Sequence, residues 1–226
     1  MAITTTDIAL LRLLQLSSAA LPVGGYSFSQ GLEYAIDDGW LRNESDIANW
    51  LSQQLSESLA AVDLPILRRQ CEAARCCDMT MLGYWNDYIL ACRETEELRL
   101  TDTAMGCALI KLLNSLDFSM KLPETLHDIS FVTAFALAAN HWQIETRVAS
   151  HGYCWSWLEN QVAAATKLVP LGQTSAQRLL GELQLDIPAA IDHSEVLEDN
   201  AIGASLPGLA MASAWHETQY SRLFRS

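Results

Sequence analysis

Apolar residues recur along this chain at spacings of three and four positions, and this spacing constrains its fold more than any other feature. Ile47, Leu51, Leu55 and Leu59 repeat every four residues, for example, which places them on one face of a helix. Sustained two-residue alternation bounded by turn residues, the pattern of a half-buried strand, is absent from the sequence. We therefore predict an all-α protein, a bundle of about nine or ten helices in a single domain that spans residues 1–226.

Capping residues and prolines predict where the helices begin and end. Asn43 begins one helix, residues 63–65 (Asp-Leu-Pro) restart another, and the long helix after Arg93 ends at Leu122-Pro123. Residues 186–208 carry several prolines and glycines among acidic residues, which favours a loose segment.

The first helix, which Thr6 or Asp7 caps, is apolar on more than one side. A short helix of this kind is usually buried, either in its own core or against another subunit. The apolar positions are Ile8, Leu10, Leu11, Leu13, Leu14 and Leu16.

Residues 16–34, the opening stretch, contain more turn residues than a simple connection between helices requires. Pro22 fixes its own backbone, while Gly24 and Gly25 permit a positive φ or the close approach of another segment. Taken alone, the opening stretch is either a tight corner between two helices or part of a binding site.

Charge and composition exclude several classes of function. The chain has 27 acidic and 14 basic residues, a formal net charge of −13, which would repel nucleic acid and anionic membranes. A basic protein partner is more compatible with this field. The six cysteines lie in apolar helical patterns, so we expect reduced core residues of a cytoplasmic protein, and no basic leader precedes the first apolar run.

Catalytic motifs are missing. None of the three lysines lies in a phosphate-binding loop, and the Gly25-Tyr26-Ser27-Phe28-Ser29 run lacks the second glycine of a nucleophile elbow. We therefore predict that the chain is not an enzyme, that it binds no cofactor, and that any nucleotide chemistry belongs to a partner.

Metal binding has weak candidates. His151 and Cys154 stand three residues apart on one helix, and Asp192-His193-Ser194-Glu195 offers an acidic surface site for a divalent ion. Core packing and a solvated acidic loop are the respective alternatives. A further run, Glu94, Glu96 and Glu97, favours a solvated helix face, with Arg93 able to pair with Glu97.

Five segments together resemble the urease accessory protein UreF family, in order from the first helix to the last residue. They are Gln15-Leu16-Ser17-Ser18, Leu21 to Glu33, Cys92-Arg93-Glu94-Thr95, Lys167 to Thr174, and His216 to Ser226.

The resemblance implies an all-α homodimer that acts as a non-catalytic adaptor. It implies binding to UreD (also called UreH), to the GTPase UreG and to apo-urease, with modulation of GTP hydrolysis and support of nickel insertion. The resemblance implies that the complex, and not this chain alone, binds nickel and GTP. Within the complex, UreG binds the GTP. The alternative is a metallochaperone that carries Ni²⁺ on its own residues, and a third reading makes Arg222 or Arg225 an arginine finger for UreG.

Two sets of residues are predicted by the resemblance to contact partners. The set facing UreG comprises Tyr26, Ser27, Gln30, Glu33, Lys167, Pro170, Gly172 and Gln173. The set that binds UreD lies in a docking tail, residues 217–226, and comprises Tyr220, Arg222, Leu223, Phe224 and Arg225. Because Glu33 and Lys167 are charged and follow turns, we expect both to be exposed and Glu33→Ala and Lys167→Ala to leave folding nearly intact.

Overall fold

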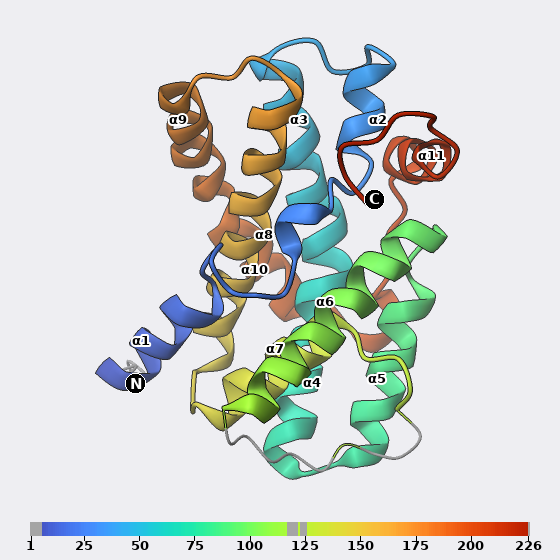
Figure 1. Cartoon of the computed structure of the whole chain (residues 1–226). Coiled ribbons are helices and arrows are strands. Elements are labelled where there is room, and N and C mark those ends of the chain that lie inside the picture. The colour runs from blue at the N-terminus through green and yellow to red at the C-terminus, as the bar shows by residue number, and fades with distance from the viewer. Residues whose placement is uncertain (1–5, 117–121, 123–125, 226) are drawn as a thin grey trace.

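A computed structural model describes residues 6–116, 122 and 126–225 of the chain, and in these ranges it contains helices and no strand. The predicted all-α class is confirmed (Figure 1). The α-helices are α1 (Asp7–Leu16), α2 (Leu32–Asp37), α3 (Glu44–Gln53), α4 (Leu64–Cys76), α5 (Met79–Ala91), α6 (Glu96–Ser115), α7 (Phe131–His141), α8 (Thr146–Leu168), α9 (Gln173–Leu183), α10 (Ile187–Val196) and α11 (Pro207–His216). Short helical segments are η1 (Gly25–Ser27), η2 (Gln54–Asp63), η3 (Gln184–Asp186) and η4 (Asp199–Ala201).

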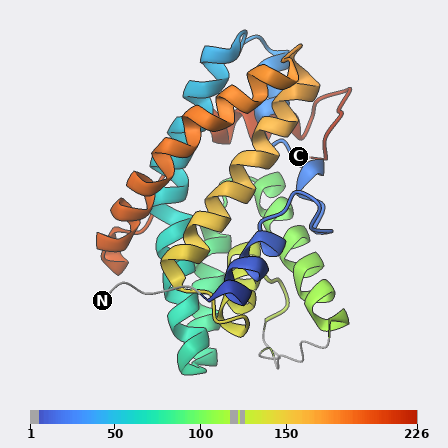
Figure 2. The ribbon, with the colours of Figure 1, turned by 90° about the vertical axis from the view of Figure 1, so that its left-hand side faces the viewer.

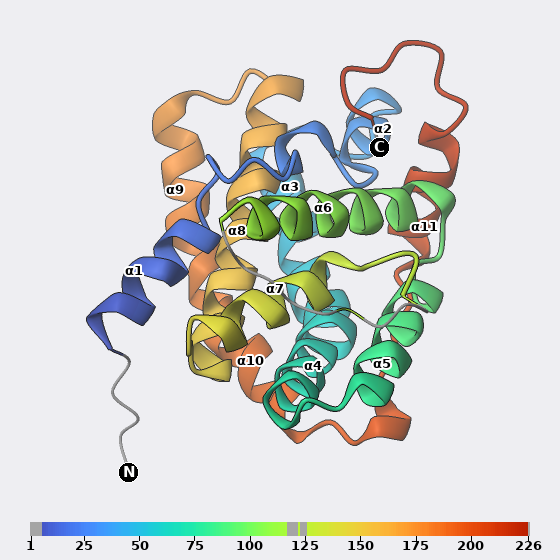
Figure 3. The same cartoon turned by 60° about the horizontal axis from the view of Figure 1, so that its bottom comes forward.

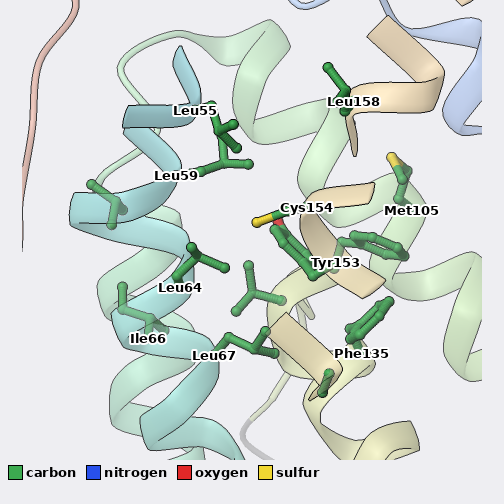
Figure 4. Close-up of a cluster of buried hydrophobic side chains, with 14 of the residues drawn as sticks. Leu55, Leu59, Leu64, Ile66, Leu67, Met105, Phe135, Tyr153, Cys154 and Leu158 are labelled. Carbon is green, nitrogen blue, oxygen red and sulfur yellow. The ribbon is translucent and has the colours of Figure 1, made fainter. Parts of the chain in front are cut away.

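Helix α7 lies at the centre of the core and packs against both α4 and α6. Every residue from Phe131 to Ala139 is buried, which explains its apolar composition on all sides. Figure 4 shows leucines of η2 and α4 facing Tyr153, Cys154 and Leu158 of α8, with Phe135 of α7 beside them. The long helix α8, which carries Tyr153, Cys154 and Leu158, runs through the molecule (Figure 2).

The predicted helix start at residues 63–65 is confirmed, since α4 begins at Leu64 with Pro65 in its first turn, but α3, η2 and α4 follow one another without a break. Pro65 has no N–H group, so it cannot bond the carbonyl of Ala61 four residues earlier. The wider π-helical turns of η2 precede the proline, and the Ala61 carbonyl accepts the N–H of Gly203 at 3.1 Å.

Residues 186–208 also differ from the prediction of a loose segment. Pro188 lies in the first turn of α10, where its missing N–H is not needed, and η4 follows. Arg69 of α4 anchors the segment by donating to Asp199 at 2.6 Å and to the Leu197 carbonyl at 2.8 Å. The predicted end of the long helix at Leu122-Pro123 falls partly outside the described residues, and α6 ends at Ser115.

Helix α1 projects from the body of the protein (Figure 3). Thr6 caps it and Asn43 caps α3, as predicted. Leu13 and Leu16 are buried, but Ile8, Leu11 and Leu14 are at least 60% exposed, so burial of this face in the chain's own core is wrong. Contact of the face with another subunit stays a prediction. Within the described residues, no helix combines the length and the apolarity needed to span a bilayer.

Candidate functional site

Two segments from opposite ends of the chain meet on one face. Beyond α11, the terminal tail, described here as residues 217–225, turns back over α2 (Figures 1 and 3). The N–H of Arg225 donates to the carbonyl oxygen of Ser27 at 2.8 Å. The tail therefore lies on the opening stretch of the same chain.

Glycines give the opening stretch a positive φ and the close approach of other segments, as the sequence predicts. Gly24 and Gly31 have φ values of +78° and +82°. At Gly25 and Gly31 a Cβ atom would lie 3.0 Å from the Asn160 side chain and 3.1 Å from the Ser213 nitrogen respectively. The chain thus turns sharply while α8 and α11 approach it closely.

Glu33 binds the tail from inside the protein. Its carboxylate accepts the N–H of Leu223 at 2.6 Å and the N–H of Phe224 at 2.9 Å. The residue is only 6% exposed, so the predicted presentation of its charge at the surface is wrong. Glu33 is the second residue of the short helix α2. It points toward the core because the chain turns sharply at Gly31, just before the helix.

Glu97 and His216 extend this contact into a network. The ring of His216 lies 3.0 Å from Glu33 Oε2 and 2.8 Å from Glu97 Oε2, through Nε2 and Nδ1 respectively. Arg222 of the tail donates to Glu97 Oε1 at 2.8 Å. Burial raises the pKa of Glu97, although the contacts with His216 and Arg222 lower it. The predicted solvated face is therefore wrong at Glu97, which is buried.

Aromatic and cationic side chains complete the tail's binding surface. Phe224 is buried, and the Nζ of Lys167 lies 5.4 Å from the centre of its ring and 5.8 Å from the centre of the Tyr26 ring. Tyr26, Tyr220 and Leu223 remain exposed around this contact. Lys167 is exposed, as predicted.

The other predicted residues lie at two places. Gln30 accepts the indole N–H of Trp157 at 3.0 Å and so joins the opening stretch to α8. Pro170, Gly172 and Gln173 are exposed at the turn between α8 and α9. The structure brings Tyr26, Ser27, Glu33 and Lys167 to the tail residues Phe224 and Arg225, while partner binding by all these residues stays a prediction.

A second buried network lies deeper, where Arg93 pairs with Asp63 and Asp102 and not with Glu97. Its guanidinium donates to Asp63 at 2.8 and 3.1 Å and to Asp102 at 2.9 Å. The Tyr153 hydroxyl donates to Asp63 at 2.8 Å, and the N–H of Phe131 donates to Asp102 at 2.7 Å. Burial raises the pKa of Asp102, and Arg93 lowers it. A cavity of about 90 Å³ adjoins these groups.

The candidate metal ligands have other roles. His151 Nδ1 lies 2.8 Å from the Arg147 carbonyl, and Cys154 is buried in the core, which raises its thiol pKa. Asp192 and Glu195 lie on α10 and pair with Arg147 at 2.6 and 2.9 Å, so the predicted acidic loop is a helix. Among the residues in the described ranges, no three His, Cys, Asp or Glu side chains gather to form a metal site.

Sequence reasoning missed His216 and Glu97 as members of the site. His216 stands in a segment that carries the family resemblance, but nothing in the residue pattern pairs it with Glu33. Glu97 was concealed by its acidic neighbours, because a run of carboxylates resembles a solvated face. Both Glu96 and Glu97 lie in the first turn of α6 after its cap Thr95, so the sequence offered no local signal to separate them.

Comparison with known proteins decides the family. The sequence model of the UreF family matches residues 41–184. The chain belongs to the UreF family. It is 60% identical to a urease accessory protein UreF of Marinomonas sp. (strain MWYL1), covering 99% of this chain and 97% of that protein. A urease accessory protein UreF of Alkalilimnicola ehrlichii is 48% identical, covering 99% and 98% of the two chains, and one of Pseudomonas entomophila is 45% identical, covering 98% and 99%. These UreF matches cover nearly the whole chain.

Proposed function

We propose that this chain is a urease accessory protein that acts as a non-catalytic adaptor in urease maturation. In this role it binds UreD (UreH) and the GTPase UreG, modulates GTP hydrolysis by UreG and supports nickel insertion into apo-urease. It acts as a homodimer in the cytoplasm. The observation that carries the proposal is the near full-length similarity to proteins named urease accessory protein UreF.

The geometry supports adaptor function through one surface. The opening stretch, the end of α8 and the terminal tail lie together, and Tyr26, Tyr220 and Leu223 are exposed there. Aromatic residues of this kind carry a large share of the binding energy at protein interfaces. The surrounding Lys167 and Arg222 supply positive charge on an otherwise acidic chain.

Size-exclusion chromatography of the purified chain mixed with UreD and UreG tests the proposal. We expect one complex that contains all three proteins. Separate elution of the three at micromolar concentrations would refute the adaptor role.

Exposed positions allow the two predicted surfaces to be separated. Leu223→Ser alters a side chain that is 64% exposed and keeps the backbone N–H that Glu33 binds, so it should weaken UreD binding alone. Gln173→Ala, at the exposed turn after α8, should weaken UreG binding alone. A matched control is Glu159→Ala, on the same helix as Lys167 but outside both predicted sets.

The alternative is a metallochaperone. In the described parts of the chain its candidate ligands are not grouped: His151 contacts the Arg147 carbonyl, and Cys154 is buried in the core. Equilibrium dialysis against micromolar Ni²⁺ distinguishes the two functions. Stoichiometric binding that is lost in His151→Ala would favour the metallochaperone and count against the adaptor.

A further inference from the structure

Gln30 adopts a backbone conformation that residues with a Cβ atom rarely take. Its φ is +52°, in the left-handed region, and Gly31 follows it with a φ of +82°. Glycine populates this region freely, whereas a residue with a Cβ atom is disfavoured there by about tenfold in population. The conformation of Gly31 therefore needs no support from its surroundings, but that of Gln30 does.

A hydrogen bond from α8 holds the side chain of Gln30. The indole N–H of Trp157 donates to Oε1 of Gln30 at 3.0 Å, and the two residues lie 127 positions apart in the sequence. Both side chains are half-buried, and an indole ring has no other donor. Trp157 therefore fixes the Gln30 side chain against a long, regular helix.

Helix α8 supports the opening stretch on both sides of this turn. It packs against η1, which precedes Gln30, and against α2, which follows it. Three residues beyond Trp157, the Asn160 side chain lies so close to Gly25 that a Cβ atom there would come within 3.0 Å of it. The Asn160 amide in turn donates to the Ser156 carbonyl at 2.8 Å. Helix α8 thus forms a fixed base beneath the opening stretch, and Trp157 contacts the turn itself.

The turn at Gln30 lies midway between two positions of the opening stretch that hydrogen-bond the terminal tail. Ser27, three residues earlier, accepts the N–H of Arg225 at 2.8 Å. Glu33, three residues later, accepts two backbone N–H groups of the tail at 2.6 and 2.9 Å. A change of φ at Gln30 would alter the direction of one contact relative to the other.

We propose that Trp157 is a positioning residue for the surface that binds the terminal tail. Its hydrogen bond stabilises the left-handed conformation of Gln30. That conformation places the Ser27 carbonyl and the Glu33 carboxylate where both can hold the tail. The proposal goes beyond the adaptor role and is measured on the chain alone.

Two substitutions of Gln30 separate this role from the simple loss of a hydrogen bond. Gln30→Ala and Gln30→Gly both remove the acceptor of the Trp157 N–H. Glycine, however, adopts the left-handed conformation without steric cost, and alanine does not. Gln30→Gly should therefore keep the tail docked, whereas Gln30→Ala should release it more often.

Hydrogen exchange of the Leu223 and Phe224 amides in the full chain measures release of the tail, because Glu33 binds both groups in the docked state. We expect exchange about tenfold faster in Gln30→Ala. A similar increase is expected in Trp157→Phe, which keeps an aromatic ring but has no N–H donor. Gln30→Gly should stay within about twofold of the unaltered chain.

A double variant and two controls complete the experiment. In the Gln30→Gly background the hydrogen bond is no longer needed, so Trp157→Phe should cause no further increase in exchange. Gln143→Ala alters another glutamine with a left-handed φ, +54°, in the turn between α7 and α8, and should leave the tail amides unchanged. The amide of Phe135, in the buried helix α7, reports global unfolding.

Equal acceleration in Gln30→Gly and Gln30→Ala would overturn the proposal, because the backbone conformation at this position would then not matter. Unchanged exchange in Trp157→Phe would also overturn it. So would an equal effect of Trp157→Phe in the Gln30→Gly background, since that result would show a loss of packing alone. If Trp157→Phe does not fold, the contrast between the two Gln30 variants decides.

Discussion

At the scale of single residues, the cost of removing Glu33 follows from its hydrogen bonds. The buried carboxylate serves two backbone N–H groups of the tail and one ring nitrogen of His216. Lys167, on the same face, makes only cation–π contacts and is exposed.

Glu33→Ala should therefore lower the free energy of unfolding by about 1–3 kcal/mol and release the tail, because it leaves buried donors without an acceptor. Lys167→Ala should cost less than about 1 kcal/mol. Urea unfolding and the rate of trimming by a carboxypeptidase measure the two effects. Equal stability of the two variants would show that the tail contact contributes nothing. The sequence predicted that Glu33→Ala leaves folding nearly intact. The buried contacts of Glu33 instead predict a measurable loss of stability.

The six cysteines differ in exposure, with Cys92 intermediate, although the sequence predicts a core position for all of them. Burial raises the pKa of Cys71 to about 12, and Cys154 is buried as well. Cys76, Cys77 and Cys107 are exposed. Alkylation of the native protein at pH 8 should modify the exposed three and spare the buried pair, as measured by peptide mass spectrometry. Rapid modification of Cys154 would indicate opening of the core beside α8.

At the scale of helices, the contact between α6 and the segment before α7 depends on one glycine. A Cβ atom at Gly106 would lie 2.1 Å from the carbonyl oxygen of Ile129, which is backbone and cannot move aside easily. Gly83, inside α5, has open space around its position.

Gly106→Ala should therefore push α6 away from α7 and destabilise the protein by more than about 2 kcal/mol. Gly83→Ala should stabilise it by about 0.5–1 kcal/mol through helix propensity. Thermal unfolding of both variants tests the opposite signs, and a neutral Gly106→Ala would show that the two segments are not packed so closely.

Local signals predicted the helices better than they predicted contacts between them. Thr6 and Asn43 identified two helix starts because a cap is recognised within four residues of sequence. Pro65 likewise identified the start of α4, because a proline is tolerated in the first turn of a helix. Glu33 and Glu97, in contrast, join the site through His216 and through direct bonds to the terminal tail, and no local pattern reveals these contacts.

At the scale of the whole molecule, Arg93 joins three separate parts of the chain. It pairs with Asp63 at the end of η2 and with Asp102 on α6, while Tyr153 of α8 donates to Asp63. Removing the guanidinium leaves two buried carboxylates without their counter-charge.

Arg93→Met should lower the free energy of unfolding by about 3–5 kcal/mol at pH 8. The loss should be smaller at pH 5. Burial already raises the pKa of Asp102, and without Arg93 the pKa rises further, so the folded state takes up a proton at low pH and loses stability as pH increases. Urea unfolding at the two pH values provides the measurement, with Tyr153→Phe as a milder control. An equal loss of unfolding free energy at pH 8 and pH 5 would show that Arg93 does not balance the charge of Asp102.

The tail that lies on its own chain is also a tethered competitor. Only six residues separate His216 from Leu223, and both contact Glu33, so the tail faces its binding surface at an effective concentration on the order of millimolar. Any protein that takes hold of the tail must first displace this intramolecular ligand. A synthetic peptide of residues 217–226 should therefore bind such a protein more tightly than the whole chain does through the same residues. Calorimetry with the peptide and with the whole chain would measure the difference in binding free energy, which is the cost of displacing the tail from its own chain.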